Sequence, residues 1–559
     1  MAYFSLHAYD ADAWIHEFKG INQADAEINA DPRFAVEAEN VETPLGVLQP
    51  HAGYDLVEGG FEGNKIETIA SFYRRWTSDT EKEWLVAAVG GHLYYRPVNG
   101  SDGWKSIDMP TGVIAFQSNV WSYVTYEINS LGDVAFENPV DVLLMSNAED
   151  GMIMVVPPDH RITWGDIAQE TWGDLKTMTW AEAIIAPDWQ IVMVDTRSDP
   201  TNDEEPQKKF GVIERHAERI WGSGVKDFPD TIYYSAAYKP LDWRPYPYYD
   251  PDDPECDPED PDTWIGQPED GAGDVMQPSW DGDKFTVLKS FGNQLLAFKG
   301  RRVWRVVGVS PGEYSFTEQF GGGTLYPNTV AVDVERVFLA DNDGISYYDG
   351  MSVKSFIREQ IQTLWRRVNR SAMDQMCAIL FKEKYYLALP IDGSEVNNAL
   401  LVYNKDEQSI LLYTDVNIES MVAAWDILYA TSSSVPGKLL ILKYNSWIEG
   451  DTTGAPTKWV SPWMDFGRKS VQKGGYEVYF TPEVRGAPMT FRFSIQTEKK
   501  KKTKIVTVQT TTFKAKQRRI RFGGTGRRFR LIIETGSAPK NTTWRLIGGI
   551  QMVVEIDPD

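Results

Sequence analysis

The sequence predicts an all-β protein: a β-propeller of roughly six to eight blades with insertions, followed by a C-terminal β-sandwich. Three observations lead to this prediction. Short hairpin patterns recur along the chain, several of them start at intervals that suit one propeller blade, and clean strand alternation replaces them after Asn445. The chain has 559 residues, more than one ordinary domain needs, but a large closed β-architecture could absorb most of them.

Each hairpin pattern consists of an apolar strand, a turn of Gly, Asn, Asp or Ser, and a second strand with aromatic or β-branched residues. The segment RVFLADNDGISYYDG, which starts at Arg336, is an example. From Gly292 onward the hairpins start 42, 49 and 42 residues apart, an interval that suits a blade of four short strands. An irregular pair of β-sandwiches is the alternative. The seven hairpins begin at Trp84, Val140, Glu218, Gly292, Val334, Glu383 and Trp425.

We divide the chain into three parts. Residues 1–60 form an N-terminal segment that packs on the propeller, residues 61–450 form the propeller, and residues 459–559 form the sandwich. The seven alternating strand patterns after Asn445, such as YEVYFTPEV and RFRLIIET, predict the sandwich. Helical signals are few. The segment Phe356–Arg367 predicts a short amphipathic helix, and residues 180–186 predict another turn or two.

Residues 244–283 predict an acidic, proline-rich insertion in the propeller. Of the 13 residues from Asp250 to Asp262, 8 are acidic and 4 are proline. Proline interrupts both helices and strand ladders, and like charges repel, so we expect an extended segment. Aromatic residues around it would tether it, or would form an interface with another molecule. These residues are Trp243, Tyr246, Tyr248, Tyr249 and Trp264.

The charge of the chain is strongly asymmetric. The net charge is −24, which argues against a general nucleic-acid binder, yet 13 Lys or Arg and no Asp or Glu lie between Lys499 and Arg530. The rest of the chain therefore carries −24 − 13 = −37. Such a split indicates ordered contact with a charged partner, and a solvated strand face is the alternative. The candidate contact residues, for a subunit or for DNA, are Lys499, Lys500, Lys501, Lys502, Lys504, Arg518, Arg519, Arg521, Arg527, Arg528 and Arg530.

The sequence also indicates the compartment. With only Cys256 and Cys377, no disulfide framework supports the fold, which suits assembly in a reducing cytoplasm. The N-terminus lacks the basic and apolar regions of a secretory signal. No run of about 18 apolar residues is present, so we expect no insertion into a membrane by the protein itself.

Motifs that carry chemistry are scarce. His216-Ala217-Glu218 has the H-x-E form of a zinc deaminase but lacks its P-C-x-x-C partner. Asp341-Asn342-Asp343 offers oxygens to calcium, but a plain hairpin turn is favoured because the D-x-D-x-D-G spacing is absent. Gly321-Gly322-Gly323 lacks the Lys and Ser/Thr of a phosphate loop. We therefore predict no catalytic residue, no cofactor and no metal site, and expect the protein not to be an enzyme.

Several segments resemble one family of bacteriophage proteins. The segment FKGINQADAEINADPRFAVEAENVETPLGVLQPHAGYD, from Phe18 to Asp55, looks like the N-terminal segment of that family. Glu214–Trp243 is similar to one of its blades, and Phe285–Gly308 and RVFLADNDGISYYDG are similar to two others. The family is that of the tail nozzle and DNA-stabilising head-closure proteins of tailed phages, in which further β domains decorate a propeller. The acidic insertion departs from the family pattern.

The resemblance implies a structural protein of the virion tail, assembled in the cytoplasm of a bacterial host. It implies a ring, which we expect to be a homohexamer, next to the portal, the adaptor and other tail proteins. Packaged double-stranded DNA would be retained by the ring and would pass through its channel without sequence-specific binding. An acidic wall would repel phosphate groups, while the basic run would dock an acidic neighbour, or in a competing version would contact DNA.

Two other functions stay open. A carbohydrate-binding or glycan-cleaving propeller of a phage receptor-binding protein is the first, because the predicted aromatic residues could stack on sugars. The second is a scaffold propeller of eukaryotic type, which is disfavoured because the G-H…W-D repeat is absent.

Overall fold

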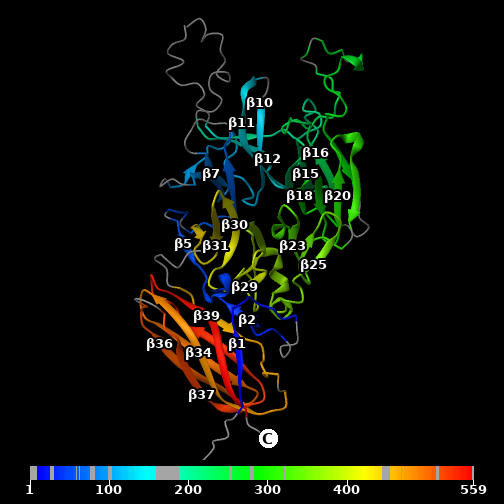
Figure 1. Ribbon diagram of the computed structural model, residues 1–559. Helices are drawn as coiled ribbons and strands as arrows, with labels where there is room; N and C mark the ends of the chain where they lie inside the picture. The colour runs from blue at the N-terminus through cyan, green and yellow to red at the C-terminus, as the bar shows by residue number, and fades with distance from the viewer. Residues whose placement is uncertain are drawn as a thin grey trace, which may run out of the picture.

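The protein is a β-propeller joined to a β-sandwich (Figure 1), as a computed structural model shows. The structure describes residues 9–24, 30–57, 59–61, 63–75, 82–98, 103–131, 134–158, 188–250, 253, 255–257, 259–276, 283–319, 321–443, 454–467, 469–511 and 515–556.

Seven four-stranded arrays, each with antiparallel neighbours, make up the propeller in the described part of the chain. The first contains β6 (Thr68–Tyr73), β7 (Glu83–Val89), β8 (His92–Pro97) and β9 (Lys105–Ser106). The second contains β10 (Ser122–Leu131), β11 (Val134–Asn147), β12 (Gly151–Val156) and β13 (Gln190–Met193). The third contains β14 (Val212–His216), β15 (Arg219–Val225), β16 (Phe228–Tyr234) and β17 (Gly273–Met276). The fourth contains β18 (Val287–Phe291), β19 (Gln294–Phe298), β20 (Val303–Val307) and β21 (Ser315–Gln319).

The last three arrays follow in the same way. The fifth contains β22 (Ala331–Val332), β23 (Val337–Asp341), β24 (Gly344–Tyr348) and β25 (Val353–Phe356). The sixth contains β26 (Cys377–Phe381), β27 (Lys384–Leu389), β28 (Ala399–Asn404) and β29 (Ser409–Tyr413). The seventh contains β30 (Ile418–Ala424), β31 (Ile427–Ser432), β32 (Leu439–Leu442) and, from the N-terminal segment, β5 (Tyr54–Leu56).

The arrays close into a ring. Contacts run from β6 to β10, β14, β18, β22, β26 and β30 in turn, and β30 contacts β6 again. A separate apolar core lies between each pair of neighbouring arrays, except that the core between the fifth and sixth also extends into the sandwich. The fold class predicted from the sequence, a propeller with a C-terminal sandwich, is therefore confirmed, and the ring has seven blades.

The seven hairpins of the sequence are the second and third strands of the seven blades. Both faces of these strands are covered, so their residues are buried almost without interruption, as in β12 and β27. Side chains on alternate positions enter different cores: Leu85 and Ala87 contact the seventh blade, whereas Val86 and Ala88 contact the second. Continuous apolar runs such as WLVAAV follow from this double burial.

The sandwich consists of two sheets that share an apolar core. One sheet has the strand order β1-β39-β34-β37, with β1 at Tyr9–Ile15, β39 at Thr543–Ile556, β34 at Lys473–Arg485 and β37 at Arg518–Gly526. The other has the order β2-β33-β38-β35-β36, with β2 at Glu37–Glu39, β33 at Thr457–Val460, β38 at Phe529–Thr535, β35 at Met489–Thr497 and β36 at Lys501–Val508. Ring pairs such as Phe480 and Phe493, with centroids 4.4 Å apart, fill the space between them.

The N-terminal segment joins the two parts. Strand β1 pairs with β39 of the sandwich, and β5 completes the seventh blade. Between them, β2 pairs in parallel with β29 of the sixth blade and antiparallel with β33 of the sandwich. The sixth blade and half of the sandwich thus form one nine-stranded sheet. Strands β3 (Val41–Glu42) and β4 (Gln49–Pro50) form a small separate ladder.

The helix expected over Phe356–Arg367 is wrong in its extent. Phe356 ends β25, and only α4 (Gln362–Trp365) is helical. Ile357 has a φ of +44°, a left-handed conformation that a right-handed helix cannot include. The segment expected at residues 180–186 lies outside the described residues. In the part of the chain that the structure describes, short 3₁₀ turns occupy Pro44–Gly46, Pro261–Thr263, Pro311–Glu313, Pro327–Thr329 and Arg370–Gln375.

The acidic insertion is folded rather than extended. It connects β16 to β17, so the predicted range 244–283 includes the outermost strand of the third blade. The chain turns back on itself, with bridges between Tyr248 and Ile265 and between Asp257 and Asp260. Aspartate side chains accept hydrogen bonds from nearby backbone N–H groups, as Asp260 does from Asp262, and these local turns replace the helix and strand bonds that proline removes.

The contact between the N-terminal segment and the sandwich is testable through Trp459. Its side chain is 0% exposed and meets Phe18 edge to face, with centroids 5.1 Å apart. We expect Trp459→Ala to lower the free energy of unfolding by about 3–5 kcal/mol, because it leaves a large cavity. Denaturant unfolding followed by circular dichroism measures this change. Trp425→Ala is the control, since Trp425 is 76% exposed; equal destabilisation by both changes would contradict the assigned core.

Candidate functional site

The basic run forms one surface at the outer end of the sandwich. Strand β36 is the last strand of the nine-stranded sheet, β37 is the last strand of the other sheet, and the two contact each other. Nearly all the Lys and Arg side chains of this region are exposed. We name this surface the cationic edge, and its exposed residues are Lys499, Lys500, Lys501, Lys502, Lys504, Lys516, Arg518, Arg519, Arg521, Arg527 and Arg528.

Ten of the candidate contact residues from the sequence belong to this edge. The eleventh, Arg530, is half-buried: its guanidinium stacks on Trp463 at 5.0 Å, and its Nε donates to Gln496 at 3.0 Å. Arg530 therefore also supports the sandwich, and its role as a contact residue stays a prediction. Lys516 is an addition, because the sequence counted it in the basic run but did not select it.

Two carboxylates from outside the basic run partly neutralise the edge. Glu477 on β34 pairs with Arg519 and Arg521 across the β34–β37 ladder, and the hydrogen bond from Arg519 above all lowers the pKa of Glu477 to about 2. Glu498 accepts the backbone N–H groups of Arg527 and Arg528. The pairing of Glu477 depends on strand register, so no local pattern in the sequence could have revealed it.

A second candidate site is a groove of about 860 Å³ between the second and third blades. The tip region of β10, the loop after β13 and the start of the acidic insertion line it. The Tyr238 side chain, 66% exposed, lies on this groove, and Lys239, Arg244 and Tyr246 follow along the insertion.

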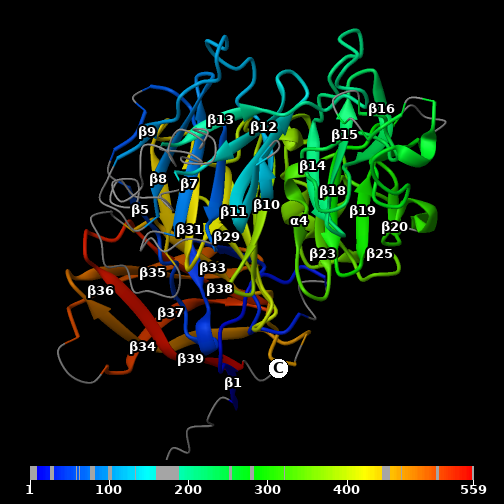
Figure 2. The ribbon, with the colours of Figure 1, turned by 90° about the horizontal axis from the view of Figure 1, so that it is seen from above.

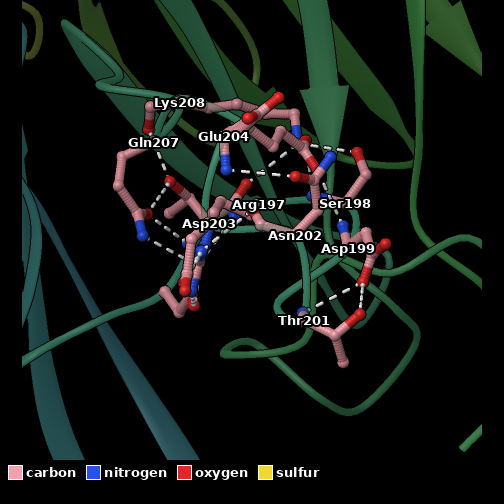
Figure 3. Close-up of polar contacts among 12 residues, drawn as sticks. Arg197, Ser198, Asp199, Thr201, Asn202, Asp203, Glu204, Gln207 and Lys208 are labelled. Atoms are coloured by element: carbon pink, nitrogen blue, oxygen red, sulfur yellow. Dashed lines mark hydrogen bonds and ion pairs between the residues drawn. The ribbon is translucent and has the colours of Figure 1, made fainter.

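The loop of residues 195–208 forms one wall of the groove and is held by its own side chains (Figure 3). Arg197 lies at its centre: Nη2 donates to Asp195 at 2.7 Å, and Nη1 donates to Asp203 and to the carbonyl of Asn202, both at 3.1 Å. Lys208 donates to Ser198 at 2.7 Å and reaches Glu205 at 3.2 Å. The cationic side chains of Arg197 and Lys208 thus pair with the carboxylates of this loop.

The predicted interface aromatics have different roles. Trp243 is 4% exposed and lies in the core between two blades, where its ring centroid is 4.6 Å from that of Phe210. It is therefore not a surface residue. Tyr246 is half-buried on the groove and donates to Asp242 at 2.8 Å. The other three hold the insertion together. The guanidinium of Arg244 lies 3.8 Å from the ring centroid of Tyr248. The ring of Trp264 lies near that of Tyr249, and its Nε1 donates to the carbonyl of Asp257 at 3.0 Å.

Two carboxylates of the groove, Asp195 and Asp242, are already engaged by arginines. Hydrogen bonds from Arg197 lower the pKa of Asp195 to about 2. Burial would raise the pKa of Asp242, but the hydrogen bonds and charge of Arg244 outweigh it and lower that pKa. A glycosidase needs one carboxylic acid with a raised pKa to protonate the leaving group, and neither group meets this requirement.

The sequence motifs weighed for metal binding form hydrogen bonds with other protein groups. His216 shares a hydrogen bond with Ser290 at 2.9 Å, and burial lowers the pKa of its imidazole to about 4. Asp341 accepts from Ser346 and from the N–H of Asp343 within a hairpin turn. Among the described residues, no group of three or more His, Cys, Asp or Glu is placed to hold a metal ion, and no helix is long and apolar enough to span a bilayer.

A buried polar cluster lies where the N-terminal segment meets the sixth blade. His51 Nε2 lies 3.0 Å from Asp415, and the imidazole stacks on Tyr413 with centroids 4.3 Å apart. Burial disfavours the imidazolium, but attraction to Asp415 and to Glu42 outweighs burial and raises the pKa of His51. Asn40 contacts Thr414 of the propeller and Pro456 of the sandwich.

Comparisons with known proteins yield distant structural likenesses. No protein-family model and no curated protein sequence matches the chain. The chain is similar to the WD40 domain of Neurospora crassa Pan2, with a TM-score of 0.35 and 7% identity over 71% of this chain and 99% of that one. It is also similar to the CNH domain of AfRom2, with a TM-score of 0.35 and 9% identity over 70% and 100%. An exo-β-1,3-galactanase from Phanerochaete chrysosporium gives a TM-score of 0.23 and 7% identity over 86% and 95%. At such scores these likenesses carry no argument about function.

The His51–Asp415 pair gives a pH-dependent prediction. The folded-state pKa of His51 lies above its ordinary value near 6.5, so the pair stabilises the fold fully below that pH and loses this contribution as pH rises through the folded-state pKa. We expect the unfolding temperature to fall more steeply in the wild-type protein than in His51→Gln when pH rises from about 6 to about 8. Scanning calorimetry at several pH values measures this difference, and parallel profiles would contradict the assignment.

Proposed function

We propose that the protein is a structural component of a bacteriophage tail, a nozzle or head-closure ring that forms part of the DNA channel. Its partners are further copies of itself, which we expect to form a six-fold ring, together with the portal, the adaptor and other tail proteins. The ring retains the packaged genome and passes it during ejection. The protein is a passive building block of the virion and not an enzyme.

One architectural observation carries the proposal: the propeller and the sandwich share one nine-stranded sheet, with the cationic edge at its far end. A shared sheet holds a docking surface at a fixed position relative to a rigid ring, which is what a subunit of a closed assembly requires. The segments that resemble the phage family agree with this role. They form β14–β16, β18–β20, β23–β24 and the N-terminal segment that joins the two parts.

The charge distribution also supports the proposal. Outside the basic run the chain carries −37, and affinity for duplex DNA depends on the number of phosphates that cations neutralise. An acidic channel wall gives DNA no strong binding site, so the duplex can move through it. In the nine-stranded sheet, β36 of the cationic edge is the strand farthest from the propeller blade, where a neighbouring protein can reach it.

Saccharide binding is a second candidate function, and the groove between the second and third blades is the observation that favours it. Tyr238 offers an exposed ring for stacking on a sugar, and Asn129, Lys239 and Asp270 offer polar groups nearby. Arginines hold the carboxylates of Asp195 and Asp242, so these two groups suit binding better than cleavage.

The ring is testable by imaging. We expect negative-stain electron microscopy of the purified protein at micromolar concentration to show closed rings with a central opening, and six-fold class averages among them. Analytical ultracentrifugation of the same sample checks the mass. A protein that stays monomeric at all concentrations, alone and with the portal and adaptor of the same phage, would rule out the proposal.

The saccharide candidate is testable with a glycan array. We expect the wild-type protein to bind at least one bacterial surface glycan and Tyr238→Ala to lose about tenfold or more in affinity, because one stacking ring contributes about 1–3 kcal/mol. Phe228→Ala is the matched control, since Phe228 is an exposed aromatic outside the groove. No glycan binding by the wild-type protein removes this candidate and leaves the structural proposal unaffected.

A further inference from the structure

The cationic edge is under-neutralised in the isolated chain. Glu477 forms ion pairs with Arg519 and Arg521. Glu498 accepts hydrogen bonds from the backbone N–H groups of Arg527 and Arg528 and, in the described part of the chain, pairs with neither side chain. The side chains of Lys499, Lys500, Lys501, Lys502 and Lys504 have no carboxylate partner among the described residues. Like charges gathered on one edge destabilise the isolated chain, so an acidic partner would be stabilising there.

The edge has features of a protein contact rather than of a phosphate contact. Ile505 is 62% exposed and stands opposite Arg492 of β35, on the outer face of the sheet, whereas Lys502 and Lys504 stand on its core face. An exposed apolar side chain beside an arginine is a common feature of protein interfaces. Phosphate groups would leave Ile505 in water, so a folded acidic protein surface fits this edge better than DNA does.

Side chains, not backbone groups, make this contact. On β36, Lys502 and Lys504 stand opposite Ile495 and Phe493 of β35, on the face of the sheet that holds the core. Lysine on an edge strand discourages another strand from adding to the sheet. The partner therefore presents carboxylates to the lysines and does not extend the sheet.

The same chain carries a surface of complementary charge at its opposite end. The acidic insertion lies beside the third blade, and the sandwich lies at the other end of the molecule in both views (Figures 1 and 2). The two surfaces cannot meet within one chain. The exposed carboxylates of the insertion are Glu255, Asp257, Glu259, Asp260, Asp262, Glu269 and Asp270.

The insertion is held in place before any partner binds. Arg219, 1% exposed on β15, donates to the carbonyls of Glu269, at 2.6 Å, and Gly271, at 2.7 Å. The ring of Tyr246 packs against Gly266, where a Cβ would lie only 2.4 Å from a ring carbon. A surface fixed in this way loses little conformational entropy on binding.

We infer that the cationic edge of one copy binds the acidic insertion of the next copy. The contact is heterologous, because each copy uses two different surfaces, and such contacts close into a ring when the rotation between copies is a fixed fraction of a turn. This inference rests on the proposed ring assembly and names the surfaces that form it. The contact weakens as salt screens the charges.

Two charge-reversal variants test the contact. Lys501→Glu/Lys502→Glu/Lys504→Glu makes the edge acidic, and Glu255→Lys/Glu259→Lys/Glu269→Lys makes the insertion basic. The three glutamates are exposed, and no contact of their side chains within the described part of the chain holds the insertion. We expect each variant to weaken self-association about tenfold or more in low salt, measured by analytical ultracentrifugation. The control Lys226→Glu/Lys438→Glu/Lys469→Glu changes the net charge by the same amount as the acidic-edge variant, at exposed sites elsewhere, and leaves assembly intact.

Mixing the two variants is the decisive measurement. The acidic edge of one variant fits the basic insertion of the other, and the two unaltered surfaces fit as well, so an equimolar mixture restores rings of alternating copies. Circular dichroism of each variant establishes that it is folded. The full chain is used throughout, because the sandwich needs β1 and β2 from the N-terminal segment.

The outcomes separate the alternatives. Rings that form normally from either variant alone, or a mixture that stays dissociated, would overturn the contact while the ring proposal stands. Absence of rings in the wild-type protein counts against the proposed function itself. Salt-sensitive binding of duplex DNA by the wild-type protein, lost in the acidic-edge variant with assembly unchanged, would assign the edge to DNA and overturn the inference.

Discussion

The N-terminal segment determines the architecture because its strands complete sheets that the rest of the chain leaves open. A propeller is stable only when its last blade closes on its first, and here β5 supplies the outermost strand of the seventh blade. Strand β1 extends the sandwich, and β2 fills the gap between β29 and β33. Without β2 the sixth blade and the sandwich would each present an exposed edge, which invites pairing with other chains. One short segment thus closes the ring and fixes the sandwich to it.

The sequence predicted the repeated part of the fold well because the signal there is local. The second and third strands of each blade are covered on both faces and joined by tight turns, so each leaves an apolar run, a turn and another apolar run. The N-terminal strands leave no such signal. Strands β2 and β5 have three residues each, and their partners lie hundreds of residues away. The predicted extent of the helix over Phe356–Arg367 was wrong because Ile357 adopts a left-handed conformation, which the spacing of apolar residues does not reveal.

The candidate site was predictable in composition but not in geometry. A run of 13 cations without an acid was visible in the sequence, yet its position on two adjoining sheet edges follows from topology alone. Glu477 lies more than 40 residues from Arg519, and only strand register brings them together. Likewise, the sequence grouped Trp243 with the aromatic residues of the proline-rich stretch that follows it, and predicted an interface role for all of them. Trp243 is buried because the chain leaves the third blade just before it and passes over Phe210.

The buried polar cluster at the junction explains how the sandwich keeps a fixed position relative to the propeller. Main-chain pairing through β2 sets the direction of the nine-stranded sheet, but a three-residue strand alone could twist. Glu42 accepts from Tyr413 at 2.9 Å and lies 3.5 Å from Lys384, and Asn40 bonds both sides of the junction. Directional bonds in a buried site allow one arrangement, because any other leaves polar groups unpaired. In the ring proposed above, an error in this angle would be repeated at every copy, so a rigid junction would favour closure.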